Sequence, residues 1–549
     1  MKRLLPLAEI LLIVGVALMP VFASFPYRIN IFLSWEGAYR MSEGQVPYKD
    51  FGMPVGYMYW VIPAIFFKVF GTQMITLIKA QAFINILAGL AFRSIFKSIG
   101  IDTTIRFLAV LVFTLSYTFF NYWPWYNHTV IVYELIALAF LMKYFFVAGG
   151  RMKNVWLVLS GVFIFFSFFT KQDGGGLAFL VCLALLCYQA ILERRWWPPL
   201  IFIISFVAAG AIMILPFTSS GFGYWFNHGQ APHSSRISVT DILREFFAAS
   251  QWLKFYLLVI AILLLASIKN WKEFWRDKRM MLFTLLTLGL LAEAAIFQVT
   301  SYVPIDNNIF FHSFAFVFII SLLSMLAPIP WAKPRTILIG TAGVLLWWSG
   351  VYWKYLERFI LKPKAETYTY TDHEGYRYAN VVNRNTFMIE LDTTNIPLNQ
   401  WRVPALKSFK KILVPGPTAD GMERLVNRDD MRNNKDMKVL NMSELTPLAA
   451  DLPFELEKGP DYPLWYHKGV AMFDKETKMF VDRIKNKYYT LVLYEYIPYL
   501  NNFYPYEVRE ALQSTYEKVD SFPAPRNPSG HSWIEVYQIR VPQKPEPAR

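Results

Sequence analysis

A series of long, almost charge-free apolar runs constrains this chain more than any other feature. A helix that crosses a lipid bilayer needs about 20 mostly apolar residues. Hydrophobic residues make up 55% of the 549 residues and charged residues only 17%, whereas soluble domains carry about 25% charged residues. This much apolar surface needs lipid to cover it, so a single soluble enzyme is excluded. The candidate spans are eleven runs: 4–25, 73–92, 104–121, 129–148, 154–170, 175–192, 198–218, 252–268, 280–300, 309–328 and 335–353.

Basic residues predict how the spans are oriented, because cytoplasmic loops are enriched in Lys and Arg. The dense basic loops all fall on one side, together with Lys2 and Arg3, if the segment 54–70 does not cross the bilayer. We therefore interpret 54–70 as a helix that lies in the outer interface. The first run also resembles a secretory signal, but its apolar core is long for one, and we interpret it as an uncleaved anchor. Residues 26–72, 219–251 and everything after 353 then face outward.

The net charge of +14 belongs almost wholly to the apolar part of the chain. Residues 1–353 hold 26 Lys and Arg against 14 Asp and Glu, and residues 354–549 hold 28 against 26. This distribution indicates membrane topology rather than a nucleic-acid surface, which needs a basic face on a soluble module. The two cysteines lie in one apolar run and build neither a disulfide framework nor a zinc site. No short zinc spacing such as His-Glu-x-x-His occurs, so neither a metal nor a cofactor is expected.

Patterns of soluble structure begin at about residue 354. Residues 411–416, 488–494 and 532–540 are predicted as strands, and 418–427, 476–486 and 504–516 as helices. Such alternation is typical of a small α/β layer domain. The predicted fold class is therefore an α-helical polytopic membrane protein, with a membrane domain over 1–353 and a soluble, extracytoplasmic α/β domain over 354–549.

The first outer loop places two carboxylates, Glu36 and Asp50, just outside the first span. A carboxylate at the edge of lipid is partly desolvated, which raises its pKa. This suits a general base that acts on a hydroxyl acceptor. The plainer alternative is that Glu36 pairs with Arg40 one helical turn further on.

The same loop resembles the first outer loop of the GT-C superfamily of glycosyltransferases, most closely that of bacterial relatives of protein O-mannosyltransferases and of the lipid A aminoarabinose transferase. The residues that carry the resemblance are Glu36-Gly37-Ala38-Tyr39 and Gly44-Gln45-Val46-Pro47-Tyr48-Lys49-Asp50-Phe51. The resemblance implies a GT-C-like fold and transfer of a sugar from a polyprenyl phosphate to an acceptor outside the membrane. The family usually shows Asp-Glu where this chain has Trp35-Glu36, and the Asp is commonly assigned as the base. Either Glu36 substitutes for it, Asp50 serves, or the activity is lost.

A cation at the level of the lipid headgroups would bind the donor phosphate and stabilise it as a leaving group. Lys171, with Gln172 beside it, lies at the outer end of a predicted span, and the alternative for it is a local pair with Asp173. Lys79 near the outer end of the second span is a functional candidate by default, unless it snorkels to the interface. The resemblance extends weakly to Lys171 and to His312. It implies that His312 faces the head group of the donor.

Further candidates for binding the donor lie in the outer loops. The segment 122–128 is rich in Trp and Tyr, which indicates either an interfacial aromatic belt or a platform for a sugar ring. The polar residues before His312 either contact the donor or cap the next helix. These additional candidates are Arg40, Tyr57, Asn127, His128, Asp306 and Asn307.

The sequence thus predicts an integral-membrane glycosyltransferase in a bacterial inner membrane, with the tail in the periplasm. Its predicted partners are a polyprenyl-phosphate-linked sugar donor, a glycan, lipid or protein acceptor, and membrane lipids, but no nucleic acid. The predicted transfer inverts the anomeric centre, with Glu36 or Asp50 as the base. The alternatives are a transporter or flippase for a lipid-linked glycan, and an enzyme of the O-antigen ligase or polymerase type.

Overall fold

The computed structural model describes most of the chain, and the statements below concern only this part. The described residues are 2–27, 31–147, 149–150, 152–226, 238–248, 251–301, 310–356, 368–371, 377–380, 396, 400–433, 437–452, 454, 456–464, 466, 468, 472–498, 504–526 and 532–539.

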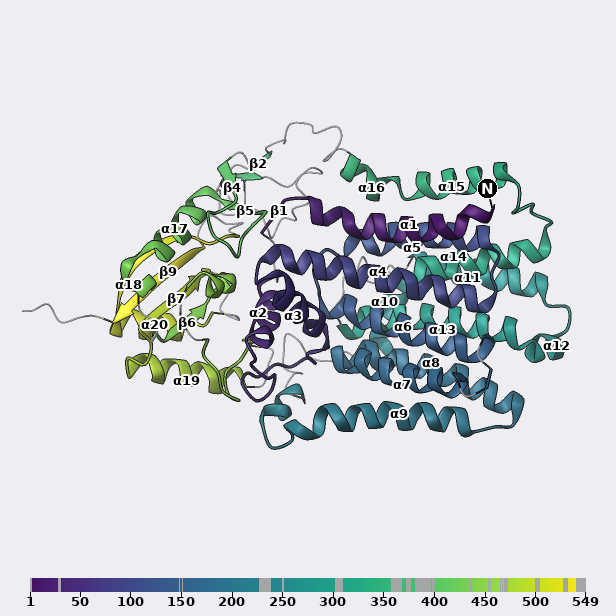
Figure 1. Ribbon diagram of the computed structural model, residues 1–549, viewed down its shortest axis with the longest axis horizontal. Helices are drawn as coiled ribbons and strands as arrows, with labels where there is room; N and C mark the ends of the chain where they lie inside the picture. Colours follow the sequence, from purple (N-terminus) through teal and green to yellow (C-terminus); the bar gives the residue numbers. More distant parts are fainter. Residues whose placement is uncertain are drawn as a thin grey trace, which may run out of the picture.

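A bundle of apolar helices forms one end of the molecule and a tail with β-sheets forms the other (Figure 1). The bundle and its outer loops contain α1 (Leu5–Leu18), α2 (Ile31–Ser42), α3 (Met58–Phe70), α4 (Met74–Ile99), α5 (Thr103–Ser116), α6 (Tyr126–Phe146), α7 (Met152–Thr170), α8 (Gln172–Glu193), α9 (Trp197–Ile214), α10 (Val239–Ala248), α11 (Gln251–Ser267), α12 (Trp271–Arg276), α13 (Lys278–Ser301), α14 (Phe311–Leu326), α15 (Pro334–Trp347) and α16 (Ser349–Leu356).

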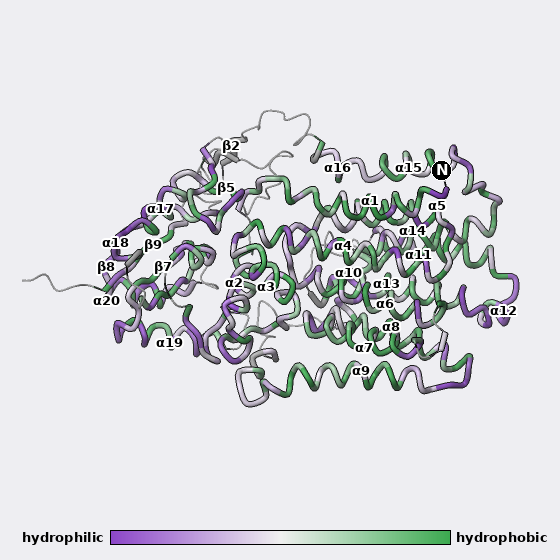
Figure 2. The backbone as a smooth tube through the Cα atoms, viewed as in Figure 1, coloured by the Kyte–Doolittle hydropathy of each residue, from purple (hydrophilic) through white to green (hydrophobic). Residues whose placement is uncertain are grey.

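The bundle confirms the prediction of a multi-pass membrane protein. Seven of the described helices are long and apolar enough to cross a bilayer, or eight if the bent pair α10 and α11 is one span. Shorter apolar helices are α3, α5, α14 and α15, so the count of eleven spans stays a prediction. Leucine, isoleucine and valine side chains remain exposed along α9 and α15, for example Ile212 and Leu346 at 76% and 77% exposure. Figure 2 shows both helices as largely hydrophobic, as expected of surfaces that face lipid.

Ionic contacts gather several loops at the end of the bundle that lies away from the tail, where the N-terminus and α12 are found (Figure 1). Lys2 Nζ lies 2.7 Å from a carboxylate oxygen of Asp102, the residue before α5. Lys278 Nζ lies 2.7 Å from Glu193 Oε1 and so joins the start of α13 to the end of α8. The basic loops that were predicted to be cytoplasmic therefore share one end of the bundle.

A buried ionic cluster also lies within the bundle. Glu9 on α1 has no exposed surface. Its two carboxylate oxygens accept hydrogen bonds from Arg93 Nε at 2.6 Å and from Arg106 Nε at 2.9 Å. The cluster ties α1 to α4 and α5, because a charge buried in an apolar bundle is tolerated only when it is paired.

The tail contains the predicted strands and helices, with shifted ends. Strand β5 (Ile412–Pro415), helix α17 (Gly416–Asn427), helix α19 (Phe473–Lys485), strand β7 (Leu491–Tyr496), helix α20 (Tyr506–Thr515) and strand β9 (Trp533–Ile539) correspond to the six predicted segments. The elements that the sequence did not predict are β2 (Tyr368–Thr371), β3 (Arg377–Asn380), β4 (Trp401–Arg402), α18 (Asp429–Asn433), β6 (Val439–Met442) and β8 (Tyr516–Pro523). The main sheet has the order β6-β7-β9-β8, in which only the β6–β7 pair is parallel.

The first outer loop is built into the tail. Its strand β1 (Phe25–Pro26) pairs in parallel with β5, so that Phe25 lies beside Ile412. The Gly52 backbone N–H donates to the Tyr462 carbonyl at 2.7 Å, and the Leu464 N–H donates to the Gly52 carbonyl at 2.9 Å. The residues just outside the first span and the tail therefore form one continuous packed surface, and the candidate site lies in it.

Candidate functional site

Helix α2 presents Glu36 at the junction between the loop and the tail. The helix is buried on most sides, and Glu36 is only 8% exposed. On the next residue, a Cβ added to Gly37 would lie 2.0 Å from an atom of the Trp60 ring. Glycine at this position therefore allows α2 to approach α3 closely and fixes where Glu36 can lie.

Arg40 holds Glu36 through two contacts with one carboxylate oxygen. Arg40 Nε lies 2.9 Å and Arg40 Nη2 2.8 Å from Glu36 Oε1. The remaining guanidinium nitrogen, Nη1, donates to Gln45 Oε1 at 2.9 Å and to the Glu457 carbonyl at 2.6 Å. The Arg40 guanidinium also lies 4.7 Å from the centre of the Tyr462 ring. Arg40, 1% exposed, is thus fixed from both the loop and the tail.

These contacts determine the protonation behaviour of Glu36. Burial raises the pKa of Glu36, and the positive charge of Arg40 with its hydrogen bond lowers it, with burial the larger effect. Because both Arg40 contacts go to Oε1, Glu36 Oε2 makes no hydrogen bond with a described residue. One oxygen of a buried carboxylate is thus left to accept a proton.

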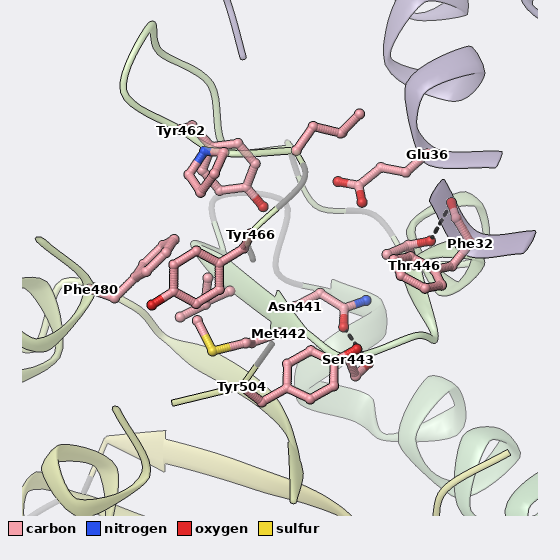
Figure 3. A pocket seen from close by; sticks show the side chains of 13 residues that line it. Phe32, Glu36, Asn441, Met442, Ser443, Thr446, Tyr462, Tyr466, Phe480 and Tyr504 are labelled. Atoms are coloured by element: carbon pink, nitrogen blue, oxygen red, sulfur yellow. Dashed lines mark hydrogen bonds between the residues drawn. The ribbon is translucent and has the colours of Figure 1, made fainter. Parts of the chain in front are cut away.

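A small cavity of about 60 Å³ lies against Glu36. Figure 3 shows the Glu36 carboxylate pointing from α2 into this space, with Tyr462 and Asn441 on the facing sides. A second, smaller hollow next to it is lined by Glu36, Arg40 and Glu457 among others. The lining residues of the first cavity are Phe32, Glu36, Leu440, Asn441, Met442, Ser443, Thr446, Tyr462, Pro463, Leu464, Tyr466, Phe480 and Tyr504. Apart from Phe32 and Glu36, they all come from the tail.

Asp50, the other candidate base, stabilises a turn of the loop. Its Oδ2 accepts a hydrogen bond from the Val46 backbone N–H at 2.7 Å, and its carbonyl accepts one from the Gly459 N–H at 2.7 Å. Asp50 is absent from the lining of the cavity beside Glu36. The two carboxylates of the loop therefore have different surroundings.

Trp35, which stands where the resemblance leads one to expect Asp, is a packing residue in this structure. Its ring is fully buried and stacks on the Tyr39 ring with centroids 4.4 Å apart. Its Nε1 donates to the Thr72 carbonyl at 3.3 Å. Trp35 thus fixes α2 against the start of α4 and is not part of the cavity lining.

Lys171 and Gln172 lie at the start of α8. Lys171 Nζ is 3.6 Å from Asp173 Oδ2, so the local pair exists, and it lies 5.4 Å and 5.0 Å from the ring centres of Tyr126 and Phe297. Gln172 Nε2 donates to the Trp225 carbonyl at 3.2 Å. Neither residue lines the cavity at Glu36.

A chain of aromatic contacts leads from Lys171 to helix α2. The Tyr126 ring next to Lys171 contacts Tyr59 at 5.9 Å, and Tyr59 contacts Trp60 at 4.6 Å, which in turn packs on α2 at Gly37. Buried polar atoms that have no hydrogen-bond partner within the described part of the chain occur here and in the adjoining 122–128 segment. They are Tyr59 Oη, Trp60 Nε1, Trp123 Nε1 and Asn127 Oδ1. Such atoms need an explanation, and sugar hydroxyls or water would supply partners.

The other predicted site residues are dispersed. His312 on α14 is hydrogen-bonded through Nδ1 to the Tyr256 hydroxyl at 2.8 Å, inside the bundle. Lys79 on α4 lies 5.1 Å from the Phe70 ring centre. Tyr57, before α3, packs against Phe169 at 5.0 Å, and the His128 carbonyl accepts a hydrogen bond from the Tyr117 hydroxyl at 2.8 Å. Asp306 and Asn307 lie outside the described residues.

The structure adds tail residues that sequence reasoning did not single out. Tyr462, Tyr466 and Phe480 face Glu36 across the cavity, and the Glu457 carbonyl binds Arg40. One weak signal for this group is present in the sequence, because Asn441-Met442-Ser443 matches a glycosylation sequon. In the structure its Oδ1 accepts a hydrogen bond from Ser443 Oγ at 2.6 Å, so the motif forms a turn at the end of β6.

Comparisons with known proteins find similarity at the level of structure. No protein-family model matches the chain, and no curated protein matches its sequence. The chain is similar to ArnT from Cupriavidus metallidurans, both bound to undecaprenyl phosphate (TM-score 0.48) and in the apo state (TM-score 0.49), at 11% identity over 97% of each chain. It is also similar to an oligosaccharyltransferase from Archaeoglobus fulgidus in complex with Zn and sulfate, at 12% identity and a TM-score of 0.38, over 62% of this chain and 51% of that one.

Proposed function

We propose that this protein is an integral-membrane glycosyltransferase that moves a sugar from a polyprenyl-phosphate donor to a hydroxyl acceptor outside the membrane. The bundle would lie in a bacterial inner membrane with the tail in the periplasm. The observation that carries the proposal is Glu36, a buried carboxylate with one uncommitted oxygen on the wall of a cavity between the loop and the tail.

In the proposed reaction Glu36 acts as the general base. Its Oε2 accepts the proton of the acceptor hydroxyl as the acceptor oxygen attacks the anomeric carbon of the donor sugar. The bond between that carbon and the phosphate oxygen breaks, and its electron pair leaves with the polyprenyl phosphate. Attack and departure on opposite faces invert the anomeric centre. Arg40 keeps the carboxylate ionised before the reaction and oriented during it.

The donor would lie on the bundle side of this carboxylate. Lys171 is the residue that precedes the first turn of α8, and its charge together with the positive end of the helix dipole suits a phosphate. A chain of aromatic contacts runs from Lys171 through Tyr126 and Tyr59 to Trp60, and aromatic faces are suitable contacts for a pyranose. Tyr57, Gln172, Asn127 and His128 stay candidates for contacting the donor, as do Lys79 and His312.

Asp50 is the weaker candidate base. One of its carboxylate oxygens already accepts the Val46 N–H, and it lies outside the cavity. Replacing it would loosen the turn of the loop rather than remove a proton acceptor. We therefore assign the base to Glu36 and a positioning role to Asp50.

One observation favours a second candidate function, the transport of a lipid-linked glycan. Helices α10 and α11 meet at an angle of 85°, and transporters use broken helices of this kind near their binding sites. A transporter would move the intact donor and release no sugar from it. An enzyme of the O-antigen ligase or polymerase type would release a glycan chain but accept no single-sugar donor.

A membrane assay separates these functions. Membranes containing the full chain are supplied with labelled polyprenyl-phosphate sugars, and sugar transfer and polyprenyl-phosphate release are measured for the native chain and for Glu36→Gln. We expect Glu36→Gln to lower the rate by at least about 100-fold, because a positioned general base contributes about 10² to 10⁴. Glu43→Gln is the matched control, since Glu43 is exposed at the end of the same helix. Equal rates for native and Glu36→Gln chains would refute the assignment.

A further inference from the structure

The cavity beside Glu36 is almost free of charge. Glu36 is the single charged side chain among the described residues that line it. The remaining lining is aromatic, aliphatic or small and polar. A phosphate or carboxylate ligand would meet the Glu36 carboxylate here but no cation in the described lining, because Arg40 is already engaged by Glu36, Gln45 and the Glu457 carbonyl, so the lining favours an uncharged ligand.

Three rings form a fixed wall on the side of the tail. The ring centres of Phe480 and Tyr462 lie 6.4 Å apart, and the two ring planes make an angle of 89°. For Phe480 and Tyr466 the distance is 5.4 Å and the angle 81°. Tyr466 is held on its other side by Phe473, with which it stacks at 4.7 Å and 18°. Edge-to-face and stacked contacts of this kind stabilise aromatic clusters. The rings are therefore preorganised, and Figure 3 shows them along one side of the cavity.

A fixed amide group lies across from these rings. Asn441 Nδ2 donates to the Leu445 carbonyl at 3.1 Å, while Asn441 Oδ1 accepts from Ser443 Oγ at 2.6 Å. These two bonds set the orientation of the amide and leave it one N–H and one lone pair. Sugar hydroxyls both donate and accept, so they complement such a group.

The position of the cavity indicates which substrate enters it. All lining residues other than Phe32 and Glu36 belong to 440–504. A donor is held at the lipid by its polyprenyl chain, and its phosphate needs a cation. Arg40 is the one cation in the linings of the two hollows, and its guanidinium is bound by Glu36, Gln45 and the Glu457 carbonyl. An acceptor that arrives from the aqueous side fits these conditions.

We propose that this cavity binds the terminal residue of an uncharged glycan acceptor, with a sugar face against the wall of Tyr462, Tyr466 and Phe480 and the acceptor hydroxyl at Glu36 Oε2. The volume of about 60 Å³ holds about four water molecules, so the end of one sugar residue enters while the rest of the glycan extends outward. This inference rests on the proposed function and names its acceptor.

The test uses the full chain in detergent or nanodiscs with maltotriose, chitotriose and mannotriose as neutral ligands, and with glucose 6-phosphate as the anionic comparison. Binding is followed by saturation-transfer NMR. We expect at least one neutral trisaccharide to bind and Tyr466→Leu to weaken that binding by about tenfold, the loss of one aromatic contact. Tyr488→Leu is the control, because Tyr488 is an exposed ring of the tail outside the cavity. The thermal melting temperature of each variant reports its folding.

The outcomes separate this inference from the proposed function. Preference for glucose 6-phosphate, binding that Tyr466→Leu leaves unchanged in a folded chain, or displacement of the trisaccharide by the lipid donor would each overturn the acceptor assignment. If the chain hydrolyses a polyprenyl-phosphate sugar but binds no neutral glycan, the inference fails and the transferase function stands. If neutral glycans bind at Tyr466 but no donor releases its sugar, the binding site stands and the transferase function fails.

Discussion

Arg40 contacts one oxygen of Glu36 with two of its nitrogens, and the other oxygen, at the cavity wall, makes no hydrogen bond with a described residue. The pair is intrahelical, four residues apart, yet it is completed by the tail through the Glu457 carbonyl and the Tyr462 ring. An ordinary surface pair at this spacing is worth little, whereas this one is enclosed by two parts of the chain. Its burial is what turns a local contact into a candidate site.

The Glu36–Arg40 pair predicts the pH dependence of transfer. Glu36 must be deprotonated to act as a base, so the rate falls as the pH drops through its pKa, which burial raises above 4.5. Arg40→Lys replaces two contacts with one point charge, so the effect of burial on the pKa of Glu36 is opposed less and the acidic limb of the rate profile moves to higher pH. Initial rates from about pH 4 to about pH 8 measure this shift. Arg424→Lys, a change at an exposed pair with Asp520, serves as the control. If the acidic limb of the rate profile stays at its native pH in Arg40→Lys, the result contradicts the role of Arg40 in setting the protonation of Glu36.

Gly37→Ala tests the close approach of α2 and α3. The new Cβ would lie 2.0 Å from the Trp60 ring, so one helix must shift, and overpacking of this kind costs about 1–3 kcal/mol. Transfer activity should fall as well, because Glu36 is the preceding residue. Gly15→Ala is the matched control, since no atom lies within 4 Å of its added Cβ. Melting temperatures in detergent measure the stability of the two variants. Equal melting temperatures for Gly37→Ala and Gly15→Ala would show that the contact with Trp60 does not confine α2.

Glu9→Gln tests the buried ionic cluster. Removing the carboxylate leaves Arg93 and Arg106 inside the bundle without their partner, which costs about 3–5 kcal/mol for a buried pair. Lys2→Gln breaks a partly exposed pair with Asp102, which is worth about 0–1 kcal/mol. The yield of monodisperse protein and its melting temperature should drop for the first variant and barely change for the second. The reverse order would contradict the structural role of Glu9.

Glu495 predicts how the stability of the tail changes with pH. Burial, and then the nearby Glu444 carboxylate, raise the pKa of Glu495 from 4.5 to about 8. The folded tail therefore keeps a proton that the unfolded chain loses, so this contribution to stability is complete below about pH 4.5 and disappears as the pH rises through about 8. Glu495→Gln should flatten that part of the curve of melting temperature against pH. The exposed Glu517→Gln should leave the slope as in the native chain, and a native slope in Glu495→Gln would count against the pKa shift.

Much of the fold could be predicted because its signals are local. Apolar runs predicted a multi-pass bundle of helices, and six segments of the tail matched observed strands and helices, since periodicity and turn residues act over a few positions. The i, i+4 spacing also predicted the contact between Glu36 and Arg40. By contrast, the wall that faces Glu36 comes from residues more than 400 positions later, and no local pattern encodes such a contact. Glu9 escaped notice for a similar reason, because its arginine partners lie 84 and 97 positions away.

The parallel pairing of β1 with β5 has a consequence for how the molecule is made. Phe25 and Pro26 are synthesised hundreds of residues before Ile412 and Leu413, beside which they lie. The edge of β1 therefore stays unpaired while the bundle is synthesised, and the loop takes its final structure only after β5 has been made. Completion of the candidate site thus depends on synthesis of the tail, so chains that end before the tail would lack the site.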